Sequence, residues 1–217
     1  MVEIKVVNVV NLSESQIEDA GRALALAFQS DPLQTYVLPD SRERAERSPA
    51  HFAALLRYGH LFGEVFTTRG APVGAAVCLP PDGWEVTPER AARAGLDQLP
   101  ALMGADAVER FDHVLAFLEP FHRRDVPSKH WYVMVVGVIP ARHGQGFGRA
   151  LLRPVIDRAD AVGLPCYLET AQPGNVPFYQ KLGFGVIADM VEPRSGLRLW
   201  TFRRTMRVDP IVGPRYE

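Results

Sequence analysis

The most constraining feature of this sequence is an apolar, valine-rich run that leads through a proline into three alternating glycines. The run Trp131–Val138 has the length and β-branched composition of a strand buried on both faces, and Pro140 ends it. Gly144, Gly146 and Gly148 lack a Cβ where a backbone must approach something closely. A helix that begins there presents unpaired N–H groups and the positive end of its dipole. The order strand, tight loop, helix therefore predicts a site for an anionic group such as a diphosphate.

The spacing of these glycines excludes two common phosphate-binding loops. The dinucleotide fingerprint G-x-G-x-x-G fails because Arg149, not glycine, follows Gly148. The P-loop fails because no Gly-Lys-Ser/Thr closes the turn. On this stretch alone, a tight strand-to-helix turn that binds nothing remains open.

A second motif about twenty residues further on narrows the interpretation. The strand-like Leu168-Glu169-Thr170 is followed by Asn175, Tyr179 and Gly183-Phe184, in the pattern N-x-x-x-Y-x-x-x-G-F. With the x-x-G-x-G turn before it, this resembles the Gcn5-related N-acetyltransferase (GNAT) superfamily. Its motif Gln/Arg-x-x-Gly-x-Gly/Ala binds the pyrophosphate of acetyl-coenzyme A, and His143 stands here at the Gln/Arg position. The resemblance is closest to puromycin N-acetyltransferase-like members and is specific across residues 131–204.

This resemblance implies an α/β fold: a central, mostly antiparallel mixed sheet of about seven strands, splayed at the cofactor wedge, with helices on both faces. The length favours one acetyltransferase domain over residues 1–217, with 131–204 as the cofactor-binding core. Residues 84–130 are expected to be a helical insertion of two helices that lines the acceptor pocket. Candidate lining residues there, each with core packing as the alternative, are Trp84, Met103, His113 and Phe117. Tyr36 is either a substrate contact or a packing aromatic.

The resemblance also implies roles for individual residues. Tyr179 matches the tyrosine that protonates the leaving thiolate, and anchoring of a short helix is its structural alternative. Glu169 is the first choice for general base, with His130 and Glu119 as rivals and a structural carboxylate as the alternative. A backbone N–H near Val136 is expected to face the thioester oxygen. The residues expected to bind acetyl-coenzyme A are Val136, Gly137, Val138, His143, Gly144, Gln145, Gly146, Phe147, Gly148, Arg149 and Asn175.

Composition points to a small-molecule partner. The net charge is −1 and no Lys/Arg cluster favours nucleic-acid binding. Cys78 and Cys166 lie in apolar runs and are interpreted as reduced core residues. No cluster has metal-ligand spacing, and no apolar stretch is long enough to cross a bilayer. We expect a cytoplasmic protein without a membrane partner, either a monomer or a homodimer.

Periodicity and turn residues predict most of the elements in chain order. A strand is expected at 4–10, a helix at 17–28, an irregular segment at 33–40, and a second helix with Pro49 in its first turn. A hairpin follows at 64–68 and 73–79, then a helix begun by Thr87-Pro88 and a longer one around 108–118. The cofactor strand is followed by a helix at 146–162 that Pro154 should kink, a strand at 165–169, a helix at 176–182, and a closing hairpin at 184–191 and 197–204.

The leading hypothesis, favoured by the two linked signatures, is a coenzyme-A-dependent N-acetyltransferase. Its expected acceptor is the primary amine of a small molecule, for example an antibiotic-like amine. A non-catalytic acyl-coenzyme-A-binding module that keeps the fold is the first alternative. An acetyltransferase acting on a protein amine is the second, and it would require an open groove where residues 84–130 are expected to form walls.

Overall fold

The computed structural model describes residues 7–205, and their centre is a seven-stranded sheet of order β1-β2-β3-β4-β5-β7-β6. All neighbouring strands are antiparallel except β4 and β5, which run parallel. The strands are β1 Val9–Asn11, β2 Glu64–Thr68, β3 Gly74–Leu79, β4 Trp131–Val138, β5 Cys166–Thr170, β6 Gly185–Val191 and β7 Arg198–Arg204. This confirms the predicted mixed, mostly antiparallel sheet.

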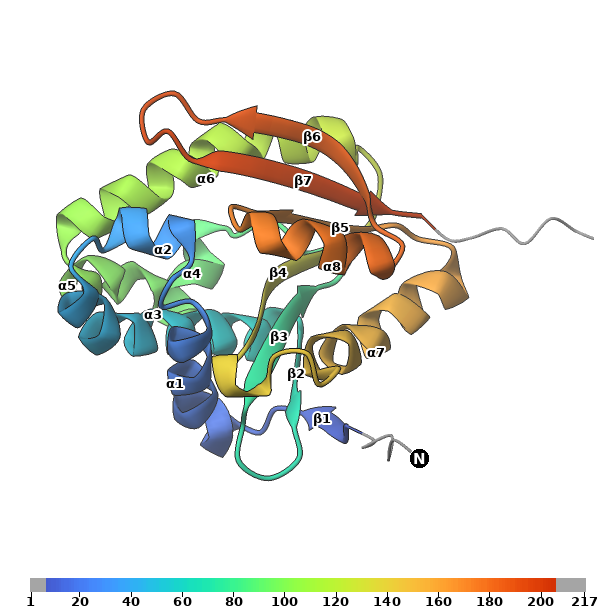
Figure 1. The fold of residues 1–217 in the computed structure, drawn as a ribbon, viewed down its shortest axis with the longest axis horizontal. Coiled ribbons are helices and arrows are strands. Elements are labelled where there is room, and N and C mark those ends of the chain that lie inside the picture. The colour runs from blue at the N-terminus through green and yellow to red at the C-terminus, as the bar shows by residue number, and fades with distance from the viewer. Residues whose placement is uncertain (1–6, 206–217) are drawn as a thin grey trace, which may run out of the picture.

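Helices cover both faces of the sheet (Figure 1). They are α1 Ile17–Ala27, α2 Pro32–Val37, α3 Ser41–Phe62, α4 Pro88–Ala94, α5 Leu99–Met103, α6 Ala105–Asp125, α7 Phe147–Val162 and α8 Val176–Lys181. One apolar core lies between the sheet and α7 with α8, and another lies between the sheet and α1 with α3. The long helix α6 lies alongside β7 in the closing hairpin (Figure 1). The predicted insertion is thus three α-helices, where two were expected.

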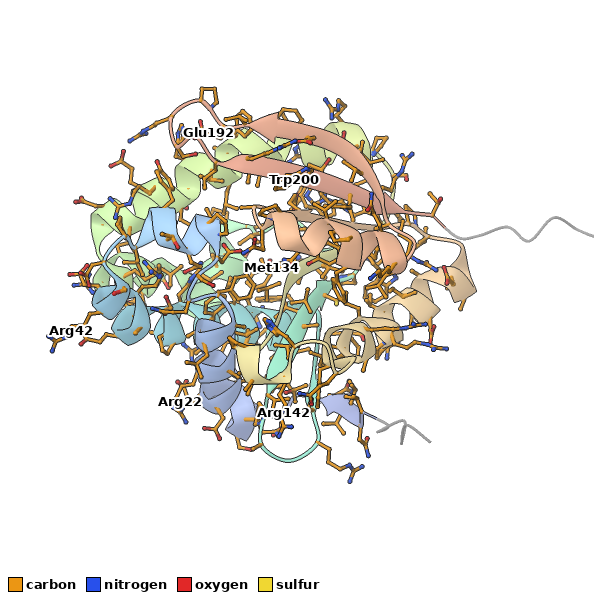
Figure 2. All side chains as sticks on the ribbon, viewed as in Figure 1. Arg22, Arg42, Met134, Arg142, Glu192 and Trp200 are labelled. Carbon is orange, nitrogen blue, oxygen red and sulfur yellow. The ribbon has the colours of Figure 1, made fainter. Side chains whose placement is uncertain are left out.

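The parallel pair β4–β5 is short. Trp131 pairs with Cys166 and Tyr132 with Tyr167, and beyond that point the two strands separate. Just after the separation β4 contains a bulge, because Val133 and Val135 pair with consecutive residues of β3 and leave Met134 between them. Met134 is labelled near the middle of the view in Figure 2, and its side chain is partly exposed. From Met134 onward the β5-facing edge of β4 is therefore available to a ligand, as the expected splay requires.

The prediction that residues 33–40 are irregular is wrong for the first half of this segment, where α2 forms. The Asp31 side chain accepts hydrogen bonds from the backbone N–H groups of Leu33 and Gln34, and Pro32 occupies the first helical position. This combination of cap and proline begins a helix even over a span of six residues.

The predicted start of the second helix at Pro49 is also wrong. Helix α3 begins eight residues earlier, at Ser41, because Asp40 caps it by accepting from the N–H groups of Arg42 and Glu43. Pro49 lies inside the helix. The charged turn before it buries Arg44, whose guanidinium donates to the carbonyls of Gln29 and Pro39, and these tertiary contacts outweigh the lost backbone bond.

Other expectations from local pattern are confirmed. Thr87 caps α4, and Gly163, at φ 69°, ends α7. The two predicted hairpins form, and Cys78 and Cys166 are buried free thiols. Part of the predicted first strand, residues 4–6, and the tail from Val208 lie outside the described residues.

Gly59→Ala is expected to destabilise the protein by about 1–3 kcal/mol, although alanine is the better helix former. A Cβ at this position of α3 would lie 2.4 Å from Val77 Cγ1 and 2.7 Å from Val65 Cγ2, within the core between α3 and the sheet. Urea unfolding would measure the loss. The exposed neighbour His60 offers the control, and a His60→Ala variant should change stability little. A Gly59→Ala protein as stable as the parent would show that this packing is loose.

Candidate functional site

A cavity of about 450 Å³ opens where β4 leaves β5, and its size is within the range of small-ligand sites. Its walls come from the end of α1, the second half of β4, the glycine turn and α8. The lining residues are Ala27, Phe28, Ser30, Asp31, Val136, Gly137, Val138, Arg142, His143, Gly144, Gly146, Phe147, Gly148, Arg149, Gln172, Asn175, Phe178, Tyr179, Lys181 and Leu182. The structure thus brings together ten of the eleven residues predicted to bind the cofactor.

The glycine turn exposes a row of backbone donors to this cavity. Gly144 and Gly146 have φ of 73° and 83°, and a Cβ on either would meet open space. The first hydrogen bond of α7 runs from the N–H of Ala150 to the carbonyl of Gly146. Among the described hydrogen bonds none uses the N–H groups of residues 144–149. These donors, at the positive end of the dipole of α7, suit an anion with several oxygens.

Side chains around the turn have separate roles. The His143 ring donates from Nε2 to the carbonyl of Val138, 2.8 Å away, and thereby ties the turn to the end of β4. Gln145, predicted to bind the cofactor, does not line the cavity, because its exposed side chain donates to the carbonyl of Ala141. The cationic side chains lining the cavity are Arg142, Arg149 and Lys181, of which the sequence analysis had selected only Arg149.

Tyr179 reaches the cavity from α8. Its ring is 5% exposed and packs against the rings of Phe178, Phe184 and Phe202. Burial, followed by the negative charge of Asp31, raises the pKa of the Tyr179 phenol well above its usual value. The phenol therefore keeps its proton at neutral pH and remains a donor.

Asn175 stabilises the junction between β5 and α8. Its side-chain Nδ2 donates to Thr170 Oγ1 at 3.3 Å, while Asn175 also lines the cavity. Asn175 thus connects the end of β5 to α8, the helix that carries Tyr179.

Asp31 is a cavity residue that the sequence analysis missed. It caps α2, and burial raises the pKa of its carboxyl from 3.8 to about 6, although the N–H groups of Gln34 and Leu33 partly oppose that rise. The sequence signal that could have revealed it is Asp-Pro at the start of a helix.

Asp31→Asn is expected to stabilise the protein at neutral pH. Since the folded-state pKa lies above the unfolded one, folding favours the protonated carboxyl, and that stability is lost as pH rises from about 4 through about 6. At about 1.4 kcal/mol per pKa unit, the ionised group costs about 2–3 kcal/mol at pH 7.5. Asparagine caps helices equally well. Urea unfolding should therefore show a gain of that size near pH 7.5, shrinking to about 1 kcal/mol near pH 4.5.

Asp40 provides the matched control for this prediction. It caps α3 through the same two kinds of backbone donor, but it is exposed. Asp40→Asn should not produce the gain in unfolding free energy expected for Asp31→Asn near pH 7.5, because the exposed Asp40 carboxylate stays in contact with water. A gain for Asp31→Asn that did not depend on pH would contradict the account.

Glu169 lies at the end of β5 but does not line the cavity. Its side chain is 11% exposed, and its Oε1 is 3.4 Å from Nδ1 of His122. Burial and the charge of Glu169 raise the pKa values of the neighbouring Tyr132 and Tyr167 phenols. Two other residues were predicted as candidates for the general base. His130 hydrogen-bonds His122, which lies next to Glu169, whereas Glu119 is exposed and pairs with Arg123. His122 was not selected from the sequence.

The structure places the proposed acceptor-lining residues in several different surroundings. Met103 is buried in a cluster with Val37 and Leu99, and Tyr36 packs beside that cluster. His113 hydrogen-bonds Glu192 at 3.0 Å, and Phe117 packs against Val114 and Leu118. The indole of Trp84 stacks on the His122 ring with centroids 4.1 Å apart. Trp84 is thereby placed next to Glu169, because His122 lies 3.4 Å from that carboxylate.

A second hollow, of about 650 Å³ and more open, lies next to Trp84 between α3 and α4. Phe62, Arg90 and Arg93 line it, with both guanidinium groups over the Phe62 ring. It contains none of the residues predicted for cofactor binding or catalysis, so the smaller cavity is the better candidate site.

No group of three or more His, Cys, Asp or Glu side chains is placed to hold a metal ion within residues 7–205. In the same part of the chain, no helix is long and apolar enough to cross a bilayer.

Comparison with known proteins adds an independent line of observation. A sequence model described as the acetyltransferase (GNAT) family matches residues 27–184. An uncharacterized N-acetyltransferase of Schizosaccharomyces pombe is 26% identical over 174 residues, which are 76% of this chain and 69% of that protein.

Solved structures with a similar fold come from bacteria and insects. One, described as histone acetyltransferase HPA2 and related acetyltransferase from Corynebacterium glutamicum, has a TM-score of 0.65 and 20% identity over 94% of this chain and 99% of that chain. Arylalkylamine N-acetyltransferase 2 from Aedes aegypti has a TM-score of 0.61 and 13% identity, covering 92% and 99%. Polyamine N-acetyltransferase of Drosophila melanogaster has a TM-score of 0.54 and 17% identity, covering 93% and 100%. At these identities the likeness shows the fold alone.

Proposed function

The chain belongs to the acetyltransferase (GNAT) family, and we propose that it transfers the acetyl group of acetyl-coenzyme A to the primary amine of a small molecule. The observation that carries this proposal is the row of unpaired N–H groups at residues 144–149, which opens onto a cavity beside the free edge of β4. The proposed reaction is direct attack of the amine on the thioester, in one domain whose cofactor core is 131–204.

The residues present fit coenzyme A on structural grounds. Open space above Gly144 and Gly146 leaves room for a diphosphate against their backbone, and Arg142, Arg149 and Lys181 supply positive charge around it. The backbone of Val136–Val138 pairs with β3 on one side only, so its other edge can bind the amide groups of the pantetheine arm as an added strand would. When bound, the cofactor supplies the acetyl group as a reactive thioester.

Protein groups supply the proton and charge chemistry in this proposal. The N–H near Val136 stabilises the developing oxyanion, and one such fixed donor contributes about 3 kcal/mol to lowering the barrier. Tyr179 donates its proton to the leaving sulfur, because its raised pKa lies above that of a thiol near 8.5. Glu169 takes a proton from the acceptor ammonium, directly or through a water.

Within residues 84–130, the support for a small acceptor comes from Trp84, although no residue of this segment lines the cavity itself. Helix α6 lies alongside β7. Trp84 stacks on the ring of His122, which lies next to Glu169. Two of the similar structures are named for small amines, the arylalkylamine and polyamine N-acetyltransferases. The resemblance of the motifs to puromycin N-acetyltransferase-like proteins agrees with an amine of this size. The similar bacterial structure described as a histone acetyltransferase keeps a protein amine as the second candidate.

A turnover assay tests the proposal. The purified protein would be incubated with acetyl-coenzyme A and a panel of aliphatic, arylalkyl, polyamine and amino-sugar amines, while free thiol and acetylated product are followed. Release of thiol matched by acetyl-amine is the expected result. Binding of the cofactor without turnover of any amine or peptide would favour a non-catalytic acyl-coenzyme-A-binding module. Turnover of lysine peptides alone would favour a protein acetyltransferase.

A further inference from the structure

Two buried histidines and a nearly buried glutamate, from three separate segments, form one chain of polar side chains. His122 lies in the last turn of α6, His130 precedes β4, and Glu169 is near the end of β5. Nε2 of His122 is 2.8 Å from Nε2 of His130, and Nδ1 of His130 is 2.7 Å from the carbonyl of Ser128. At its other end the chain meets Glu169.

The Ser128 carbonyl determines which ring nitrogens carry protons. A carbonyl only accepts, so Nδ1 of His130 must donate to it, which leaves Nε2 of a neutral His130 bare. Burial lowers the pKa of His130, which favours the neutral ring. Nε2 of His122 must then donate to His130, so a neutral His122 presents a bare Nδ1 to the carboxylate of Glu169. Two acceptors therefore lie 3.4 Å apart, a distance at which a proton added to the ring would make them an ion pair.

The surroundings of His122 suit a ring that becomes positively charged. The ring is stacked between Trp84 and Tyr167, with centroids 4.1 Å away on both sides, and Tyr132 lies at 4.7 Å. Aromatic faces attract a cation.

The other charged groups near this site are occupied elsewhere. Asp125, one turn from His122 along α6, accepts from Thr201 and pairs with Arg124. Arg123 lies over the outer face of the Trp84 ring and is exposed. Glu169 is thus the carboxylate that faces the bare nitrogen of His122.

We propose that His122 is the positioning residue that receives, through Glu169, the proton given up by the acceptor ammonium. This rests on the proposed acetyl transfer. In the step, an N–H bond of the ammonium breaks, its electron pair stays on nitrogen, and the proton passes to Glu169 and on to Nδ1 of His122. The carboxylate is regenerated beside an imidazolium, and His130 shares the added proton through Nε2. After the transfer, the positive charge of the His122 imidazolium stabilises the negative charge of the nearly buried Glu169 carboxylate.

His122→Asn tests the relay kinetically, because an asparagine amide can donate to Glu169 but cannot take up the proton. We expect kcat/KM to fall about 10- to 50-fold, with the KM for acetyl-coenzyme A unchanged, and the acid limb of its pH profile to move to lower pH, since a carboxylate alone titrates below an imidazole. His113→Asn is the matched control, because His113 lies on the same helix and also faces a glutamate, Glu192. It should leave kcat/KM and the profile unchanged.

Nitrogen-15 NMR of the histidine rings tests the same relay without turnover. At alkaline pH, His122 should carry its proton on Nε2 with Nδ1 bare, and it should gain a second proton as pH falls. In Glu169→Gln the midpoint of that titration should move to lower pH, because the carboxylate that stabilises the imidazolium is gone.

The two arms separate the relay from the proposed function. An absence of turnover with the NMR pattern intact would refute acetyl transfer while leaving the proton pair in place. Turnover that His122→Asn and His113→Asn lower equally, or a His122 ring protonated on Nδ1 and bare on Nε2 at alkaline pH, would overturn the relay. If His122→Asn does not fold, the histidine ring spectra of the parent and of Glu169→Gln still show whether the relay exists.

Discussion

Tyr179→Phe is expected to lower kcat by about 10²- to 10³-fold while leaving the affinity for coenzyme A unchanged. The phenol reaches the cavity and keeps its proton, so its removal takes away the donor to the leaving thiolate and little else. The ring remains packed on Phe178, Phe184 and Phe202, so the fold should be retained. Steady-state kinetics with a reactive amine, together with calorimetry of coenzyme A binding, would measure both quantities.

Tyr58 supplies the control for this substitution. It is a buried tyrosine outside the cavity, and its hydroxyl donates to the carbonyl of Glu85 at 3.2 Å. Tyr58→Phe removes an oxygen from the interior in the same way but should leave kcat unchanged. Full activity in Tyr179→Phe would assign this tyrosine to packing of α8, the structural alternative to catalysis.

Gly146→Val is expected to weaken coenzyme A binding by about 10²-fold or more. The residue has φ 83°, where a β-branched side chain is strained, and its Cβ would project into the open space at the mouth of α7. The side chain would occupy the volume that the proposed diphosphate needs and would tilt the free N–H groups away from it. Calorimetric titration measures the change in affinity.

Gly70→Val separates strain from binding. Gly70 also has a left-handed backbone, φ 80°, and open space around a Cβ, but it lies in the turn between β2 and β3 and does not line the cavity. Both variants should lose similar unfolding free energy, about 1–2 kcal/mol. Only Gly146→Val should lose affinity, and equal affinity in the two variants would mean that the ligand does not use the turn.

The parts of the fold that the sequence predicted are those set by local pattern. Residues 131–204 combine a β-branched run, glycines at fixed spacing and helix periodicity, so the cofactor strand, α7 and the closing hairpin follow from short-range rules. The family resemblance, not these rules, supplied the predicted cofactor residues, and ten of them line one cavity.

The parts that were wrong or missed depend on tertiary contacts. Helix α3 passes through Pro49 because buried Arg44 and the Asp40 cap begin it earlier, and neither feature alters the apolar periodicity. The Asp31-Pro32 pair was a local signal for the start of a helix, but the place of Asp31 in the cavity depends on its enclosure by α8 and β4. The pairing of His122 with Glu169 joins residues 47 positions apart, so no spacing in the sequence indicates it.

Isothermal titration calorimetry with coenzyme A and with pantetheine, which lacks the diphosphate, tests the central claim most directly. If the unpaired N–H groups of residues 144–149 hold the diphosphate, coenzyme A should bind at least about 10²-fold more tightly than pantetheine. The absence of heat from coenzyme A, or equal affinity for the two ligands, would contradict the account.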